Sequence, residues 1–396
     1  MIPKAPYKKP IYLDYNSTTP MDERVFEAMR PYFIEKFGNA SSKTHSYGWD
    51  ADIGVESARK QIALAINCLP KEIYFTSGAT ESNNLALKGA ISYVLGHSQS
   101  HEPIHVITTT TEHKAVYDVL KSEESPQVEV TYLPCDKYGR VTLEQVKKAQ
   151  RPNTVLVSII FGNNEIGTVN PIGEIGAYLT SQGILFHTDA AQAIGQIPVD
   201  VQKLNVDFLS LSGHKIYGPK GVGALFIREI PKRARLSPIL YGGGQEKQRR
   251  PGTLNVPGIV GFGKAAEVSV HELQKNNEHI QSLRDEMILE LLKIPFIQLN
   301  GHPLERLPNN ISVTLEGVSN SQLLMELKDL ALSTGSACTT GSTEPSHVLK
   351  ALGHSDELCM STIRIGIGRT TTREEMLIAT QRIKQVALNL KERSRF

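Results

Sequence analysis

The feature that most constrains this chain is a unit that repeats along its first half: an apolar run, a short polar stretch, then a helical pattern. The apolar runs are residues 72–76, 104–110, 154–160, 183–188 and 206–211. Strands that alternate with helices are typical of βαβ units, whose strands lie parallel in one sheet. Because the carboxyl ends of such strands meet at one edge, ligands bind there. We therefore expect a large α/β domain with a pocket at that edge.

Composition fits a large domain with a smaller one. The 396 residues are 40% hydrophobic, and 43 Lys and Arg nearly balance 41 Asp and Glu, so we expect no nucleic-acid and no membrane partner. The first ten residues lack the apolar stretch of a signal peptide, and no apolar run is long enough to span a membrane, which predicts a cytoplasmic protein. The four cysteines are scattered, which predicts neither disulfides nor a metal site.

Polar side chains follow the apolar runs, at the positions where a pocket is expected. They are Thr80, His113, Asn164, Asp189, Gln192, His214 and Lys215. Each has a local alternative: His113, Asn164 and Asp189 as helix caps, and Gln192 as solvated surface. One convergent pocket explains all seven positions, so we favour it.

Lys215 stands between two apolar runs, in a polar turn that begins at Ser212. A lysine fixed at a strand end and partly desolvated suits a Schiff base, whereas a surface lysine in a hairpin loop is the alternative. The turn Ser77-Gly-Ala-Thr80, where a strand becomes a helix, suits a phosphate, although an ordinary strand-to-helix turn looks the same. Pyridoxal 5'-phosphate needs a lysine, a phosphate anchor and a carboxylate beside its pyridine nitrogen, and Asp189 can supply the last.

Six strings, in the same order along the chain, resemble those of the cysteine desulfurases, which are class V, fold-type I pyridoxal-phosphate enzymes. They are residues 12–20 (Tyr-Leu-Asp-Tyr-Asn-Ser-Thr-Thr-Pro), 75–84, 111–116, 163–167 (Asn-Asn-Glu-Ile-Gly), 187–192 and 212–221. The resemblance runs from about residue 11 to about residue 372. It implies a large domain, residues 14–260, with a mostly parallel seven-stranded sheet, and a smaller α+β domain formed by residues 1–13 and 261–396.

The resemblance also implies a cofactor-binding set. Its members are Ala79, Thr80, Asn164, Asp189, Gln192, Ser212, Gly213, His214, Lys215 and Thr253. Asp189 is implied as the partner of the pyridine nitrogen, His113 as the stacking acid or base, and Lys215 as the imine lysine. Thr253, in a stretch from 242 that reads as a flexible cationic loop, matches a threonine that reaches the phosphate of the neighbouring subunit, which implies a homodimer.

A polar stretch from Leu332 to His347 surrounds Cys338 and predicts a mobile loop. It is similar to the family's long-loop subgroup, in which the cysteine moves between the cofactor and an external acceptor. The resemblance places Arg364, with Asn39 or Asn164, on the substrate carboxylate. The other cysteines, Cys68, Cys135 and Cys359, lie beside apolar or structured segments and are expected to be structural.

The implied function is pyridoxal-phosphate-dependent removal of sulfur from L-cysteine, which gives L-alanine and a persulfide on Cys338. The sulfur would pass to an iron–sulfur scaffold or another acceptor. A selenocysteine lyase or a cystine C–S lyase would share the pocket without needing Cys338. A transaminase would leave Cys338 without a function. A non-catalytic scaffold would be expected to have lost catalytic residues, and the set is intact here. Long-loop members continue past their last helix in a tail that helps to dock the scaffold, and this chain ends at Phe396, which argues against docking in that manner.

Two further helical patterns run from Asp22 to Phe33 and from about Ile259 to Leu292, and a third has Val55, Ala58 and Ile62 on one stripe.

Overall fold

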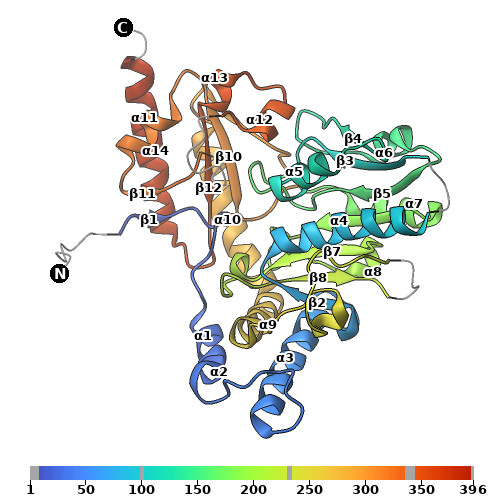
Figure 1. Cartoon of the computed structure of the whole chain (residues 1–396). Helices are drawn as coiled ribbons and strands as arrows, with labels where there is room; N and C mark the ends of the chain where they lie inside the picture. Colours follow the sequence, from blue (N-terminus) through green and yellow to red (C-terminus); the bar gives the residue numbers. More distant parts are fainter. Residues whose placement is uncertain (1–8, 99–101, 230–233, 335–343, 394–396) are drawn as a thin grey trace.

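The protein is described from a computed structural model that covers residues 9–98, 102–229, 234–334 and 344–393. Two sheets dominate the part of the chain in these ranges, one in each half of the molecule (Figure 1). The large sheet has the strand order β2-β8-β7-β6-β5-β3-β4. Its strands are β2 (Ile73–Thr76), β3 (Ile104–Thr109), β4 (Val128–Leu133), β5 (Thr154–Ser158), β6 (Leu185–Asp189), β7 (Phe208–Ser212) and β8 (Gly223–Ile227).

Among these seven strands, β8 alone runs opposite to the other six. It pairs antiparallel with both β2 and β7, while β3, β4, β5, β6 and β7 are paired in parallel. The predicted fold class, an α/β protein with a mostly parallel seven-stranded sheet, is confirmed. The carboxyl ends of the parallel strands therefore share one edge, as the repeated units predict.

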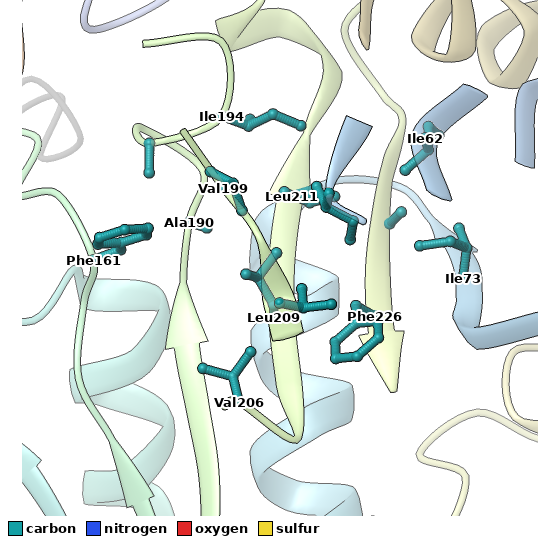
Figure 2. Packing of buried hydrophobic residues seen from close by; sticks show 14 of the residues in the cluster. Ile62, Ile73, Phe161, Ala190, Ile194, Val199, Val206, Leu209, Leu211 and Phe226 are labelled. Atoms are coloured by element: carbon teal, nitrogen blue, oxygen red, sulfur yellow. The ribbon is translucent and has the colours of Figure 1, made fainter. Parts of the chain in front are cut away.

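Helices cover both faces of the large sheet because successive strand side chains point to opposite sides. Leu209 and Leu211 of β7 and Phe226 of β8 pack into a core with Ile62 (Figure 2). Residues of opposite parity, such as Phe208, pack into a second core on the other face. The helices are α3 (Ser46–Ala65), α6 (Leu143–Ala149), α7 (Ile172–Gln182), α8 (Val201–Leu204) and α9 (Val256–His271) on the first face, and α4 (Ala79–His97) and α5 (Lys114–Glu123) on the second.

The small sheet is antiparallel and has the order β12-β10-β9. Its elements are β9 (Ile297–Leu299), β10 (Asn310–Leu315), β12 (Thr362–Gly366), α10 (Leu273–Leu291), α11 (Asn320–Glu326), α12 (His347–Ala351), α13 (Asp356–Cys359) and α14 (Arg373–Arg393). A short parallel pair, β1 (Ile11–Tyr12) with β11 (Leu330–Ala331), attaches the N-terminal segment to this half. Leu13 packs in the hydrophobic core of this half, with residues of the small sheet and its helices. The division into 14–260 and 1–13 with 261–396 stays a prediction; residue 260 lies within α9, whose Phe262 packs in the core of the large sheet.

Two predicted helices are wrong in extent. The pattern from Asp22 to Phe33 forms two helices, α1 (Glu23–Met29) and α2 (Pro31–Ile34), because Pro31 starts a new helix at its N1 position. The pattern from Ile259 to Leu292 is divided into α9 and α10 at Glu272. The helix predicted around Val55 is confirmed as α3.

The cationic stretch from 242 to 253 is also more ordered than its sequence suggested. It contains a short 3-10 helix, η3 (Gln245–Gln248), whose Glu246 is buried. Arg59 of α3 donates two hydrogen bonds to the Glu246 carboxylate, at 2.7 and 3.0 Å. This buried ion pair explains why the stretch folds back on α3 instead of remaining a solvated loop.

Candidate active site

A cavity of about 570 Å³ lies at the carboxyl edge of the parallel strands. All seven polar residues that follow the apolar runs and were expected to converge line this cavity. Up to 135 positions separate them in the chain, from Thr80 to Lys215. The complete set of predicted site residues on its wall is Ala79, Thr80, His113, Asn164, Asp189, Gln192, Ser212, His214, Lys215 and Arg364. The topology of the sheet has therefore produced the single pocket that the sequence predicted.

Lys215 ends η2 (Gly213–Lys215), the single turn that follows β7. Its Nζ donates to the carbonyl oxygen of Ser17 at 2.7 Å and to that of Asn16. The turn is tight: a Cβ at Gly213 would lie 3.0 Å from the Pro219 carbonyl oxygen, so a residue without a side chain suits this position. Gly213 supports the wall from behind and does not line it. The lysine amine is thus aimed into the cavity from a fixed backbone.

His214 stays neutral at physiological pH. Burial, together with the positive charges of Lys215 and Lys220, lowers the pKa of His214 to about 4. Its Nδ1 lies 3.1 Å from the hydroxyl oxygen of Thr18, within hydrogen-bond distance. The imidazole therefore adds no positive charge beside the lysine amine.

Asp189 ends β6 and is almost fully buried. Asn83 of α4 donates to its Oδ2 at 2.7 Å, and the backbone N–H of Ala191 donates to its Oδ1 at 2.9 Å. Both oxygens thus accept hydrogen bonds, which hold the carboxylate in one orientation. Asn83 was not among the predicted residues, yet it determines how this carboxylate is oriented.

The start of α4 forms one end of the cavity. Gly78 is its N-cap, and Ala79 and Thr80 are in its first turn, where backbone N–H groups have no acceptor within a helix. Ser77, Gly78, Ala79 and Thr80 all line the cavity. A helix N-terminus with free donors facing a cavity is suited to a phosphate.

His113 fills both roles that its sequence position allowed. It is the N-cap of α5, and its Nδ1 accepts the backbone N–H of Ala115 at 3.0 Å. The same ring lines the cavity. Because Nδ1 accepts, the other ring nitrogen carries the hydrogen in the neutral ring. Capping therefore fixes the tautomer and the orientation of an imidazole that faces the ligand space.

Arg364, on β12, brings the small sheet to the cavity. Its Nη1 donates to the Asn164 carbonyl oxygen at 3.0 Å, and its Nη2 donates to Ser17 Oγ at 2.6 Å and to Asp14 Oδ1 at 2.9 Å. Its Nε is buried and has no hydrogen-bond partner among the described residues. The guanidinium plane is therefore held by the protein and faces a cavity that could admit a carboxylate.

Comparison with known proteins decides what this arrangement belongs to. A model of the class-V aminotransferase family matches residues 11–378. The chain is 49% identical over 387 residues to the mitosomal cysteine desulfurase of Encephalitozoon cuniculi, covering 98% of this chain and 88% of that one. It is 46% identical over 391 residues to the human cysteine desulfurase, covering 98% and 84%.

The chain belongs to the cysteine desulfurase family. A solved NifS-like protein, 36% identical, matches it with a TM-score of 0.88 over 96% of this chain and 100% of that one. Membership confirms the predicted enzyme class, which depends on pyridoxal phosphate. Among the described helices, none is long and apolar enough to cross a membrane. The name of one relative places that protein in the mitosome, so a cytoplasmic location for this chain stays a prediction.

The cavity of this desulfurase-family chain fits pyridoxal phosphate by the chemistry of its donors. Ala79 and Thr80 at the N-terminus of α4, the lysine Lys215 and the carboxylate Asp189 all line it. A Cβ built on Gly78 would meet no atom within 4 Å, so the turn leaves open space beside those donors. Anion site, amine and carboxylate are the three groups that this cofactor needs.

Besides Gly213, two described residues of the predicted site do not line this cavity. Thr253 and Asn39 are both exposed and are absent from its wall. The Asn39 side chain accepts the backbone N–H of Ser41 at 2.9 Å. Cys338 lies outside the described residues. The roles assigned to Thr253, Asn39 and Cys338 therefore stay predictions.

The described chain on either side of Cys338 is hydrogen-bonded to Arg364, which lines the cavity, and to Glu165, which follows the lining residue Asn164. Ser333 and Arg364 exchange backbone hydrogen bonds at 2.7 and 3.3 Å. On the other side, Ser346 Oγ donates to Glu165 Oε2 at 2.5 Å, and Glu165 is buried next to Asn164. Burial raises the pKa of Glu165, against the opposing effect of the Ser346 hydrogen bond.

Sequence reasoning missed one whole wall of the site. Asn16, Ser17 and Thr18 line the cavity, together with Glu81, Lys220 and Gly221. The hydroxyl of Thr19 donates to the His214 carbonyl oxygen at 2.9 Å, which joins this N-terminal segment to the lysine turn. The polar string from 15 to 20, placed directly between a strand and a helix, was the available signal.

Proposed function

We propose that the protein removes the sulfur atom from L-cysteine, releases L-alanine and retains the sulfur as a persulfide on Cys338. One observation carries the proposal: a lysine, a buried carboxylate and a buried arginine line one cavity. On either side of Cys338 the chain is hydrogen-bonded to Arg364, which lines that cavity, and to Glu165, the neighbour of the lining residue Asn164.

Arg364 is proposed to bind the substrate carboxylate. A guanidinium presents parallel N–H groups that match a carboxylate, and this one is already oriented by the Asn164 carbonyl and by Asp14. Asp14 partly neutralises the arginine before substrate arrives. The carboxylate must therefore share the guanidinium with Asp14 or displace the Ser17 hydroxyl from it.

Lys215 and His113 are proposed to handle protons. When bound, pyridoxal phosphate condenses with an amine and acts as an electron sink for the α-carbon of the substrate. Lys215 is placed to hold the cofactor before substrate arrives, and its amine then takes the proton from the substrate α-carbon. Asp189 would be the charge partner of the pyridine nitrogen, and His113 would lie over the ring as an acid or base.

Cys338 is proposed as the sulfur acceptor. Its thiolate attacks the substrate sulfur, so that a sulfur–sulfur bond forms while the carbon–sulfur bond breaks. The electron pair of the broken bond stays with the carbon fragment, which gains protons and leaves as L-alanine. Cys338 is five positions after Ser333, and an extended chain of that length reaches about 17 Å. Because Ser333 is hydrogen-bonded to Arg364, a chain of that length is long enough to reach the cavity, which supports the proposal.

We propose that the protein works as a homodimer. The segment from α1 to the start of α3 exposes several large apolar side chains, namely Phe26, Phe33, Ile34, Phe37, Tyr47, Trp49 and Ile53. Exposed apolar patches of this kind usually mark an interaction surface. A second copy would cover them and would explain why Thr253 is exposed away from its own cavity. A protein acceptor, such as an iron–sulfur scaffold, would then take the sulfur from Cys338.

Product analysis of two variants tests the function. Purified protein with pyridoxal phosphate and L-cysteine is expected to release alanine rather than pyruvate. Cys338→Ala should bind the cofactor but give no steady-state alanine, and Lys215→Ala should lose both activity and the lysine-linked absorbance band. Cys135→Ala is the matched control, because its half-buried thiol donates to the Ala351 carbonyl oxygen at 3.4 Å. Full alanine production by Cys338→Ala would contradict the proposal, and a pyruvate product would favour a C–S lyase.

A further inference from the structure

The N-terminus of α4, which we expect to bind the cofactor phosphate, also carries a carboxylate. The negative charge of this carboxylate should disfavour a bound phosphate. Glu81 lies in the first turn of α4 and lines the cavity. Its Oε2 accepts the backbone N–H of Ser77 at 2.8 Å, so it occupies one of the donors in the same turn. A phosphate ester carries about −1.5 to −2 charges at neutral pH. Two anions at one helix N-terminus repel each other unless one of them is neutralised.

Arg250 neutralises Glu81. Its Nε donates to Glu81 Oε1 at 2.7 Å, and its Nη2 donates to Oε2 at 3.2 Å. The arginine and glutamate side chains are only 22% and 15% exposed, so water screens this pair less than it screens a surface pair. Burial opposes ionisation of Glu81, but the hydrogen bonds from Arg250 and Ser77 outweigh it and lower the pKa of Glu81. Arg250 does not line the cavity, and its contact with the cavity wall is through Glu81.

The backbone around η3 maintains this contact at a conformational cost. Glu246, Lys247 and Gln248 all have left-handed φ values, of 46, 55 and 64°. Such values are unfavourable for residues with side chains, and they persist only where surrounding contacts hold them. Two contacts hold this backbone in place. The Arg59–Glu246 ion pair lies before Arg250 in the chain, and Gly252, which lies after it, donates its backbone N–H to Gln245 Oε1 at 3.0 Å.

We propose that Arg250 is a positioning residue for the cofactor phosphate. It neutralises Glu81 and draws the carboxylate to the outer side of the turn, which leaves the donors of Ala79 and Thr80 for the phosphate. Glu81 in turn keeps Ser77 in place. This inference concerns cofactor retention and does not depend on the fate of the substrate sulfur.

A double-mutant cycle on cofactor affinity tests the proposal. The holoenzyme is dialysed to equilibrium against graded pyridoxal phosphate at low salt, and bound cofactor is read by absorbance. Arg250→Met leaves the Glu81 charge unpaired, so affinity is expected to fall about tenfold, a loss that shrinks as salt rises. Glu81→Gln keeps an acceptor for Ser77 without the charge and is expected to bind at least as tightly as the wild type. The double variant Arg250→Met with Glu81→Gln should recover to within about threefold of the wild type.

The cycle separates neutralisation from a structural role. If the double variant binds as weakly as Arg250→Met, the arginine supports the loop rather than the charge balance, and the proposal is overturned. Unchanged affinity in Arg250→Met overturns it as well. If Arg250→Met does not fold, Glu81→Gln alone tests the proposal. A loss of cofactor affinity of more than about threefold in Glu81→Gln would show that the carboxylate favours cofactor binding, and the proposal would be overturned.

Discussion

Replacing Arg364 with lysine tests how the substrate carboxylate is held. The arginine is almost fully buried, and its two Nη atoms are fixed by the Asn164 carbonyl, the Ser17 hydroxyl and the Asp14 carboxylate. Lysine keeps the charge but loses the planar fork, so it cannot satisfy these acceptors and a substrate carboxylate with two parallel hydrogen bonds. The change therefore removes geometry while leaving the charge in place.

The size of the effect follows from the contacts that are lost. One charge-assisted hydrogen bond contributes about 1.5–3 kcal/mol, which corresponds to a fall in kcat/KM of roughly 10- to 150-fold. Most of the loss is expected in KM, because the carboxylate does not react. Cofactor content should remain that of the wild type, since Arg364 is not among the residues proposed to hold the cofactor.

Initial rates of alanine formation against L-cysteine concentration provide the measurement. Asp14→Asn is the control: it removes the competing carboxylate, so KM should fall or stay within about threefold of the wild-type value. An unchanged KM in Arg364→Lys, with full cofactor content, would refute the role of the guanidinium. A rise in KM for Asp14→Asn as large as that for Arg364→Lys would show that the pair acts structurally.

Three other changes test separate contacts. Ser346→Ala removes the hydrogen bond to Glu165, worth about 1 kcal/mol, and should lower kcat for alanine formation about fivefold without changing KM. Glu165→Gln keeps an acceptor for Ser346 and should stay close to the wild type. Equal losses of kcat in both variants would contradict the role of this hydrogen bond in anchoring the chain after Cys338. Burial lowers the pKa of His187 to about 4, so the unfolded chain binds a proton from about pH 6.5 downward while the folded chain does not. As the pH is lowered from 6.5 to 4, this residue should therefore reduce the free energy of unfolding by up to roughly 3 kcal/mol. The thermal midpoint should fall over the same range, and the fall should be smaller in His187→Gln. Arg59→Met leaves the buried Glu246 carboxylate unpaired and should cost about 3–5 kcal/mol, visible as a lower unfolding midpoint that Arg59→Met with Glu246→Leu largely recovers.

The sequence predicted the cavity well where sheet topology determines it. Thr80, His113 and Lys215 each follow a strand and Asp189 ends one, and parallel strands bring such positions to one edge whatever the helices between them do. Local patterns were enough, because no long-range contact had to be guessed. The break at Pro31 was also available from the sequence, since proline favours the first turn of a helix over its interior.

The contacts that local patterns could not supply are those between distant segments. The path of Asn16 and Ser17 onto the lysine turn depends on hydrogen bonds to residues nearly 200 positions away. The Arg250–Glu81 pair spans 169 positions and comes from a stretch that reads as solvated and cationic. Neither periodicity nor spacing predicts which charge a flexible-looking segment will meet, because tertiary packing decides it.

The central claim is that the sulfur of L-cysteine passes to one thiol of this chain. The protein is mixed with cofactor and L-cysteine that carries an isotopically labelled sulfur, quenched without reductant, digested, and analysed by mass spectrometry. We predict that the peptide containing Cys338 gains one labelled sulfur atom in the wild type and none in Lys215→Ala. Alanine release with the label on another cysteine, or with no labelled thiol at all, would contradict the account.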